Sequence, residues 1–202
     1  MEELFRRDGY VVVPGVLGSE DLEVARRHLN GFAVPANGQV AVSIDHDPVA
    51  AGIAAHPLLV GLARRLLAAD CEVFGFTYLV KPPRSPLVVL WHQDGHPWRA
   101  RGIHEALTVW VAVDGAGPAS GGLRVIPGSH RMEVRALGPN TSVESMFGWE
   151  SPAEMVDETA AVDIVLEPGD VSVHDPALLH SSGSNRTEHR RAGLGLRYRA
   201  LS

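Results

Sequence analysis

The apolar positions of the chain follow two different periods, a helical one in the N-terminal third and a strand-like one further on. Leucines recur on one face over Pro57–Ala69, with arginines on the other face, which predicts an amphipathic helix. A second helix is expected from Ser19 to about Leu29, because Ser19 suits an N-cap and acidic residues fill the first turn. A short helix ending near Asp8 and a strand over Val11–Val13 are expected before it.

Beyond residue 70, short β-branched segments alternate with turns rich in Gly, Pro and Asp. This pattern predicts a mainly β fold, a double-stranded β-helix (a jelly roll, cupin-like) with flanking N-terminal helices. We expect one domain over residues 1–202, with a barrel core at about 72–200 and helical N-terminal support in 1–70. Residues 31–48 are expected to form a loop, and the mixed pattern of 138–158 suggests an excursion from the barrel. The expected strands are Glu72–Val80, Leu87–Trp91, Leu107–Val113, Gly122–Ile126, Val162–Leu166, Asp170–His174 and Gly193–Ala200.

Composition narrows the class of protein without naming a function. The chain has 202 residues, of which 45% are hydrophobic and 21% charged, as in ordinary globular proteins. The single cysteine, Cys71, cannot form an intrachain disulfide, so a cytoplasmic location is expected. The net charge of -6 argues against a nucleic-acid partner. No apolar run approaches the roughly 18 residues of a membrane span, and the N-terminus lacks the apolar core of a signal peptide.

The first candidate for chemistry is the triplet His92-Gln93-Asp94, at the end of an apolar run. If the strand continues through it, the imidazole and the carboxylate share one face, because side chains alternate along a strand. Two such ligands and a distant histidine make the facial triad that holds non-heme Fe(II). In a chain with 10 histidines, however, a core or capping role for His92 is an equally good interpretation of the triplet alone.

The downstream sequence supplies the partners that such a site needs. His180 follows a tight turn and a predicted strand, and it is the candidate third ligand. On the last strand, Arg191 shares a face with Gly193 and Gly195, which leaves room for a ligand. An arginine in such a position suits a bidentate anchor for a carboxylate. Arg190 takes that role instead if the strand register differs by one residue.

Taken together, these motifs resemble the phytanoyl-CoA dioxygenase family of Fe(II)/2-oxoglutarate-dependent oxygenases. The resemblance covers most of the chain, and the Pro-Gly-Ser-His block with the ordered His-x-Asp, His and Arg is its most specific part. The segments that carry it are Phe5–Val13, Lys81-Pro82-Pro83, Trp91-His92-Gln93-Asp94, Gly121–His130, Pro168-Gly169-Asp170, His180-Ser181-Ser182, Asn185 and Arg191.

The resemblance implies a dioxygenase that uses Fe(II), with 2-oxoglutarate and O2 as cosubstrates, and releases succinate and CO2. Arg191 and Ser182 would bind the distal carboxylate of 2-oxoglutarate. Because related halogenases lack the carboxylate ligand, Asp94 favours hydroxylation. The implied residues are, for iron, His92, Asp94 and His180, and, for 2-oxoglutarate, Arg191, Ser182, Trp110 and Thr77.

Several of these residues also have plain structural interpretations. An inward Trp110 is as well explained by core packing. His174 is expected to pack or hydrogen-bond, Ser129 and His130 to fix a turn, and Lys81 to extend along the barrel rim. Two other functions stay open: a cupin-type zinc or manganese hydrolase or isomerase that does not use 2-oxoglutarate, and a non-catalytic jelly-roll binding module.

The substrate is expected to be a small free molecule, an amino acid or a natural-product intermediate, and not an acyl-CoA. Little sequence separates the N-terminal strand from the Pro57 helix, which leaves less material for recognising a large cofactor-linked substrate. The segment after the His-x-Asp triplet is the candidate substrate loop, although a solvated loop explains it equally well. Its candidate substrate residues are His96, Trp98, Arg99 and Arg101, and the apolar Met146, Phe147 and Trp149 form a candidate lid.

Overall fold

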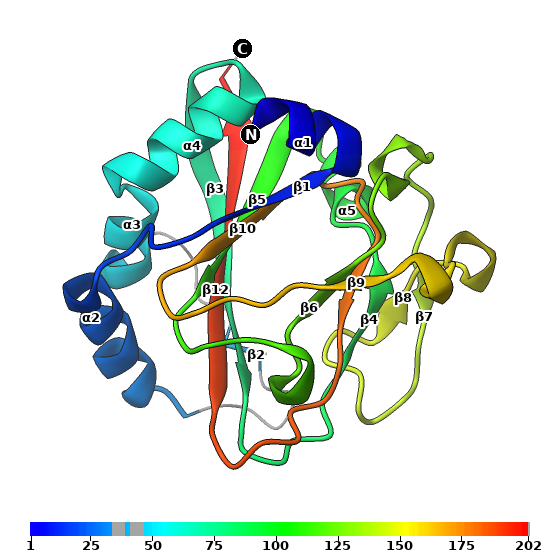
Figure 1. Cartoon of the computed structure of the whole chain (residues 1–202). Helices are drawn as coiled ribbons and strands as arrows, with labels where there is room; N and C mark the ends of the chain where they lie inside the picture. Colours follow the sequence, from blue (N-terminus) through cyan, green and yellow to red (C-terminus); the bar gives the residue numbers. More distant parts are fainter. Residues whose placement is uncertain (34–38, 41–46, 202) are drawn as a thin grey trace.

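Two antiparallel sheets lie against each other in the computed structural model, which describes residues 1–33, 39–40 and 47–201 (Figure 1). The large sheet has the strand order β1-β10-β5-β12-β3-β2, and the small sheet has the order β4-β11-β6-β9. This is the predicted jelly-roll arrangement. The strands are β1 (Tyr10–Val13), β2 (Gln39–Val40), β3 (Cys71–Lys81), β4 (Val89–His92), β5 (Ala106–Ala112), β6 (Leu123–Val125), β7 (Gly138–Pro139), β8 (Trp149–Glu150), β9 (Val162–Asp163), β10 (Val171–His174), β11 (His180–Ser182) and β12 (Arg191–Ala200).

The N-terminal part forms the predicted helices and also contributes two strands to the large sheet. Gly18 is the N-cap of α2, so Ser19 is the first helical residue and not the cap. A helix was not expected at α3, where the Asp47 carboxylate caps the first turn by accepting from two backbone amides. Within the predicted 31–48 loop, Gln39–Val40 form the short strand β2, which was also not expected, and residues 34–38 and 41–46 lie outside the described residues. The helices are α1 (Glu2–Asp8), α2 (Ser19–Asn30), α3 (Pro48–Ala54), α4 (Pro57–Leu67) and α5 (Gly95–Arg99).

Helices α2, α3 and α4 cover the outer face of the large sheet (Figure 1). Leu194, Leu196 and Tyr198 of β12 are buried in the apolar cluster that these helices complete. The Tyr198 hydroxyl donates a hydrogen bond to the Ala54 carbonyl of α3 at 2.7 Å. The alternate residues of β12 therefore face the other way, toward the small sheet, as the glycine pattern predicted.

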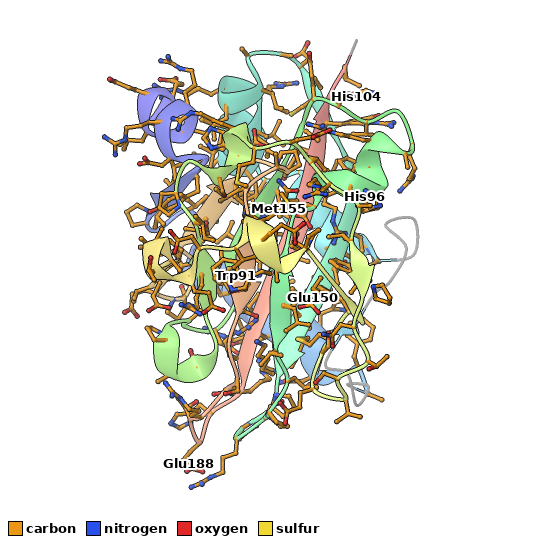
Figure 2. The ribbon with its side chains drawn as sticks, turned by 90° about the vertical axis from the view of Figure 1, so that its right-hand side faces the viewer. Trp91, His96, His104, Glu150, Met155 and Glu188 are labelled. Atoms are coloured by element: carbon orange, nitrogen blue, oxygen red, sulfur yellow. The ribbon has the colours of Figure 1, made fainter. Side chains whose placement is uncertain are left out.

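The 138–158 segment leaves the barrel, as predicted, and returns along β4. It is tied there by a bridge between Val88 and Ser145 and by a hydrogen bond from the Ser151 amide to the Trp91 carbonyl at 2.7 Å. Figure 2 views this side, where Met155 lies beside Trp91 and belongs to the same apolar cluster. The segment therefore forms a fixed wall over the small sheet.

Within the described residues, no single helix has the length and apolar composition needed to span a bilayer. The neighbouring helices α3 and α4 meet these two criteria only as a pair bent by 56°.

One close approach inside the barrel requires glycine. A Cβ built on Gly193 would lie 2.0 Å from Cζ2 of Trp110 on the neighbouring strand β5. The indole thus occupies the space that any side chain at Gly193 would need. At Gly195, by contrast, the nearest atom to an added Cβ is the Thr77 carbonyl oxygen at 3.8 Å, an ordinary contact.

We therefore expect Gly193→Ala to lower the free energy of unfolding by about 1–3 kcal/mol, the usual effect of overpacking a core. Gly195→Ala is the matched control on the same face of the same strand, and it should leave stability unchanged or slightly raised. Urea unfolding followed by tryptophan fluorescence measures both variants. Equal stabilities for the two variants would contradict the packing described for Trp110.

Candidate metal centre and cosubstrate cavity

The His92-Gln93-Asp94 triplet does not continue as a strand. Strand β4 ends at His92, and Asp94 has helical angles (φ -62°, ψ -27°) as the residue that caps α5. The same-face argument from strand alternation is therefore wrong. The chain turns because the Gln93 side chain is buried and donates a hydrogen bond to the Ala177 carbonyl at 2.7 Å. That turn brings the Asp94 carboxylate back over the end of the strand.

Three donor atoms nevertheless converge. Nδ1 of His92 is 2.8 Å from the Leu90 carbonyl oxygen, and Nδ1 of His180 is 2.9 Å from the Leu178 carbonyl oxygen. Each ring thus donates through Nδ1 to the backbone two residues earlier, which leaves Nε2 free as an acceptor. The two Nε2 atoms lie 3.6 and 4.0 Å from Oδ1 of Asp94.

The charge states of these groups also suit metal binding. Burial alone would raise the pKa of the Asp94 carboxyl, but His174, His92 and His180 around it hold that pKa well below its usual range. Burial lowers the pKa of His180, and the neighbouring His92 and His174 lower it further. An ionised carboxylate and a neutral imidazole are the forms that bind a metal.

The other oxygen of Asp94 is held by the large sheet. The Thr108 hydroxyl on β5 donates to Oδ2 at 2.8 Å, and Nε2 of His174 on β10 lies 3.6 Å from the same atom. Neither ring nitrogen of His174 has a hydrogen-bond partner within the described part of the chain. Oδ2 is thereby fixed and Oδ1 faces the two imidazoles. Two imidazole nitrogens and one carboxylate oxygen on one side of a cavity fit Fe(II), with coordination positions left open.

The donors open into a cavity between the two sheets. All seven residues predicted to bind iron or 2-oxoglutarate line this one cavity. The lining residues are Thr77, Leu79, Val89, His92, Asp94, Thr108, Trp110, Leu123, Phe147, His174, His180, Ser181, Ser182, Arg191, Gly195 and Arg197.

Arg191 lies in the cavity wall and is only 2% exposed. Its guanidinium donates to the carbonyls of Leu79 and Gly121 and stands 5.6 Å from the centre of the Trp110 ring. Its Nε has no hydrogen-bond partner among the described residues. Burial lowers its pKa to about 10, with Asp114 acting in the opposite sense, so the group is still charged at neutral pH. A buried cation with an unused donor is a prepared site for an anion.

Lys81 is a buried neighbour of this site, and the expectation that it lies at the barrel rim is wrong. Its side chain is fully buried, and Nζ donates to Ser182 Oγ at 2.7 Å and to the carbonyls of Ser182 and Gly183. Burial, and to a smaller extent the neighbouring charge of Arg191, together lower the pKa of Lys81 to about 6. Register across β12 and β3 pairs Lys81 directly with Arg191, which the sequence alone does not reveal.

Arg190, the alternative anchor, faces away from the cavity. Its Nε donates to Asp114 Oδ2 at 2.9 Å on the outside of the barrel. The strand register therefore favours Arg191, as the glycine pattern predicted.

The excursion supplies an apolar wall beside the metal donors. The rings of Phe147 and Trp149 are stacked at 4.8 Å, and both meet the His92 ring edge-on, at 5.7 and 5.0 Å. Phe147 lines the cavity, in the place predicted for a lid.

None of the four candidate substrate residues lines the cavity. Residues Gly95–Arg99 form helix α5, with Arg99 exposed, and Trp98 packs in a separate cluster with Phe74. Arg101 lies at another surface depression, and His96 is half-buried on the helix (Figure 2).

The geometry can now be set beside known proteins. The family model described as phytanoyl-CoA dioxygenase (PhyH) matches residues 5–193. The chain belongs to the phytanoyl-CoA dioxygenase family. It is accordingly an enzyme of the Fe(II)/2-oxoglutarate-dependent dioxygenase class, as the motifs indicated.

Two relatives within this class have names that state an activity. The L-proline trans-4-hydroxylase of Streptomyces griseoviridis is 26% identical over 98% of this chain and 85% of that protein. The ectoine dioxygenase of Sphingopyxis alaskensis is 26% identical over 98% of this chain and 74% of that protein.

Solved structures of other proteins have the same fold. EctD from S. alaskensis with 2-oxoglutarate and 5-hydroxyectoine has a TM-score of 0.78 and 26% identity, covering 99% of this chain and 75% of that one. EvdO2 from Micromonospora carbonacea var. aurantiaca with 2-oxoglutarate has a TM-score of 0.81 at 22% identity, covering 99% and 89%. The predicted jelly-roll fold is confirmed.

Removal of one donor should abolish metal binding. We expect His180→Ala to weaken Fe(II) binding more than about 100-fold, because even indirect partners of metal ligands contribute roughly 10–100-fold. Anaerobic calorimetric titration measures the affinity, and His189→Ala, outside the cavity, is the control. Unchanged binding in His180→Ala would exclude it as a ligand.

Lys81 should make stability depend on pH with a defined sign. Its pKa is about 6 in the folded protein and 10.5 in its ordinary state, so between these values the unfolded chain holds a proton that the folded protein lacks. The contribution of Lys81 to the free energy of unfolding therefore rises as the pH rises from about 6 to 10.5. Below about pH 6 the folded protein must bury Lys81 in its charged form, so the destabilisation is largest there.

We expect the free energy of unfolding of the wild type to rise from about pH 6 to about pH 9 relative to that of Lys81→Met, which has nothing to titrate there. Urea unfolding of both proteins across this range is the measurement. Parallel profiles would mean that Lys81 keeps its ordinary pKa in the fold.

Proposed function

We propose that this enzyme hydroxylates an unactivated C–H bond of a small molecule, consuming 2-oxoglutarate and O2 and releasing succinate and CO2. The observation that carries the proposal is one cavity with an open three-donor metal site at one end and the buried, incompletely bonded Arg191 at the other. A cupin hydrolase or isomerase has no use for that arginine.

In this proposal, His92, Asp94 and His180 hold Fe(II), which when bound supplies the activation of O2. The backbone carbonyls that accept from the Nδ1 atoms fix both rings. The Thr108 hydroxyl holds the second carboxylate oxygen, with the His174 ring beside it, so that Asp94 presents a single oxygen to the metal.

The rest of the cavity orients the cosubstrate. Arg191 and Ser182 bind the distal carboxylate of 2-oxoglutarate, and Trp110 and Thr77 flank its carbon chain from neighbouring strands. Phe147 helps to exclude water from the metal end.

The substrate is proposed to be an amino acid or a natural-product intermediate, free in the cytoplasm, and not an acyl-CoA. The relatives named for L-proline and ectoine support a small free molecule. Asp94 favours hydroxylation over halogenation, because it fills the position that a halide would need. We further propose that the whole chain acts as one domain.

The direct test is turnover of 2-oxoglutarate by the Fe(II)-loaded protein over a panel of amino acids and natural-product intermediates that includes L-proline and ectoine. Succinate and hydroxylated product should form in equal amounts, with O2 required, for one compound of the panel. Product formation without O2 and without 2-oxoglutarate would instead support a hydrolase or isomerase.

Arg191→Gln should raise the KM for 2-oxoglutarate roughly 10- to 100-fold, since a hydrogen bond to a charged group contributes about 1.5–3 kcal/mol. Arg190→Gln is the matched control, because it removes the adjacent guanidinium from the opposite face of the strand. Succinate formation as a function of 2-oxoglutarate concentration measures both. Equal KM values in the two variants would sink the assignment of Arg191.

A further inference from the structure

A second arginine of β12 faces the same cavity. Arg197 shares the cavity face with Arg191 but stands at the other end of the strand, where the register pairs it with Thr108. The Thr108 hydroxyl bonds Asp94, so Arg197 belongs to the metal end of the cavity. No role has yet been given to Arg197.

The guanidinium of Arg197 has no acidic partner. Its Nη1 donates to the Thr77 hydroxyl at 3.0 Å, and no carboxylate of the described residues lies within 4.0 Å. Arg199, two residues further along the strand, is paired with Glu72 outside the cavity. Burial lowers the pKa of Arg197, and the more distant Asp94 carboxylate acts in the opposite sense.

Two glycines lie beside this arginine. Its neighbour across the strand pair is Gly75, and a Cβ built there would lie 3.7 Å from Nη1, in ordinary contact. Gly195 next to it also carries no side chain and lines the cavity. The Thr77 hydroxyl holds one edge of the guanidinium, and the remaining donors are available to a ligand.

Charge balance indicates what that ligand is. With Fe(II) and 2-oxoglutarate bound, the metal and Arg191 together balance Asp94 and the cosubstrate dianion. The charge of Arg197, whose side chain is half-buried, is then left without a counter-charge in the cavity. A further anionic group, or a closer contact with one already present, would supply that counter-charge through a charge-assisted hydrogen bond.

We propose that Arg197 is a second carboxylate-binding residue of the cavity, at the metal end and separate from the site for the distal carboxylate of 2-oxoglutarate. The carboxylate is either that of the substrate or the one beside the keto group of 2-oxoglutarate. The first source makes the substrate a carboxylic acid, such as a free amino acid, and excludes neutral compounds and thioesters. This inference rests on the proposed function, because it places both molecules in the cavity.

The test compares Arg197→Gln with Arg199→Gln, a matched control on the same strand whose side chain is outside the cavity. Calorimetric titration of the metal-free protein with Mn(II), and of the Mn(II)-loaded protein with 2-oxoglutarate, measures the two dissociation constants without turnover. A second arm measures succinate release with pairs of an acid and its amide, beginning with L-proline and L-prolinamide and including any active compound of the panel.

If the keto-acid carboxylate is the ligand, Arg197→Gln should weaken 2-oxoglutarate binding roughly 10- to 100-fold with unchanged Mn(II) affinity. If the substrate is the source, 2-oxoglutarate affinity should be retained, and the wild-type preference for the acid over its amide should disappear. Arg197→Lys should recover part of either loss, and Arg199→Gln should behave as the wild type.

The inference is overturned if Arg197→Gln leaves both the 2-oxoglutarate affinity and the preference for the acid unchanged. It is also overturned if the variant lowers only the affinity for Mn(II), because that result is expected of a residue that only compensates the charge of Asp94. If no panel compound is active, the 2-oxoglutarate arm decides alone. Should Arg197→Gln fail to fold, Arg197→Met keeps the length and the apolar stem of the side chain, removes the charge, and should give the same loss. A wild type that does not bind 2-oxoglutarate refutes the proposed function itself.

Discussion

The Asp94 carboxylate lies among the rings of His92, His174 and His180, and the rest of the cavity is arranged around this contact. Its Oδ1 is 3.6 and 4.0 Å from two Nε2 atoms, which are longer distances than those of hydrogen bonds. Three donor groups thus converge without bonding to one another, which is the arrangement that a metal site requires. The backbone carbonyls behind the His92 and His180 rings fix the direction in which each Nε2 points.

Strand β12 links the cavity to the hydrophobic core of the protein. One face of the strand carries Leu194, Leu196 and Tyr198 into the core beneath the N-terminal helices. On the opposite face, Arg191, Gly195 and Arg197 line the cavity, and Gly193 makes room for the Trp110 indole. The helices therefore fix the height and rotation of the strand, and the cationic groups take their places as a consequence. The apolar cluster under α2 to α4 thus supports the strand that carries the two arginines of the cavity.

Most of the candidate site could be predicted from the types of residue and their order along the chain. The two histidines, Asp94 and Arg191 were identified from motif order and from strand alternation at the glycines, and they line one cavity. The prediction that Asp94 lies on a strand was wrong, because the turn depends on Gln93 reaching a carbonyl far along the chain. The burial of Lys81 likewise depends on which residue of β12 it pairs with.

The fold of the candidate substrate loop was likewise not predictable from the sequence alone. Polar and aromatic residues directly after the ligands suggested a role at the substrate, but they form helix α5, which turns Trp98 toward Phe74. Arg197, in contrast, was accessible from the sequence, since it shares strand alternation with Arg191. The sequence places several arginines near the C-terminal end. Only the burial and the partners of each side chain show which of them face the cavity.

The most direct test of this account is a crystal structure of the protein with Fe(II) and 2-oxoglutarate, prepared without O2. The account predicts iron bound by Nε2 of His92, Nε2 of His180 and Oδ1 of Asp94, with His174 unbound and the distal carboxylate of 2-oxoglutarate against Arg191. A closed metal site in which His174 supplies a fourth protein ligand, with Arg191 still bonded only to backbone carbonyls, would contradict it.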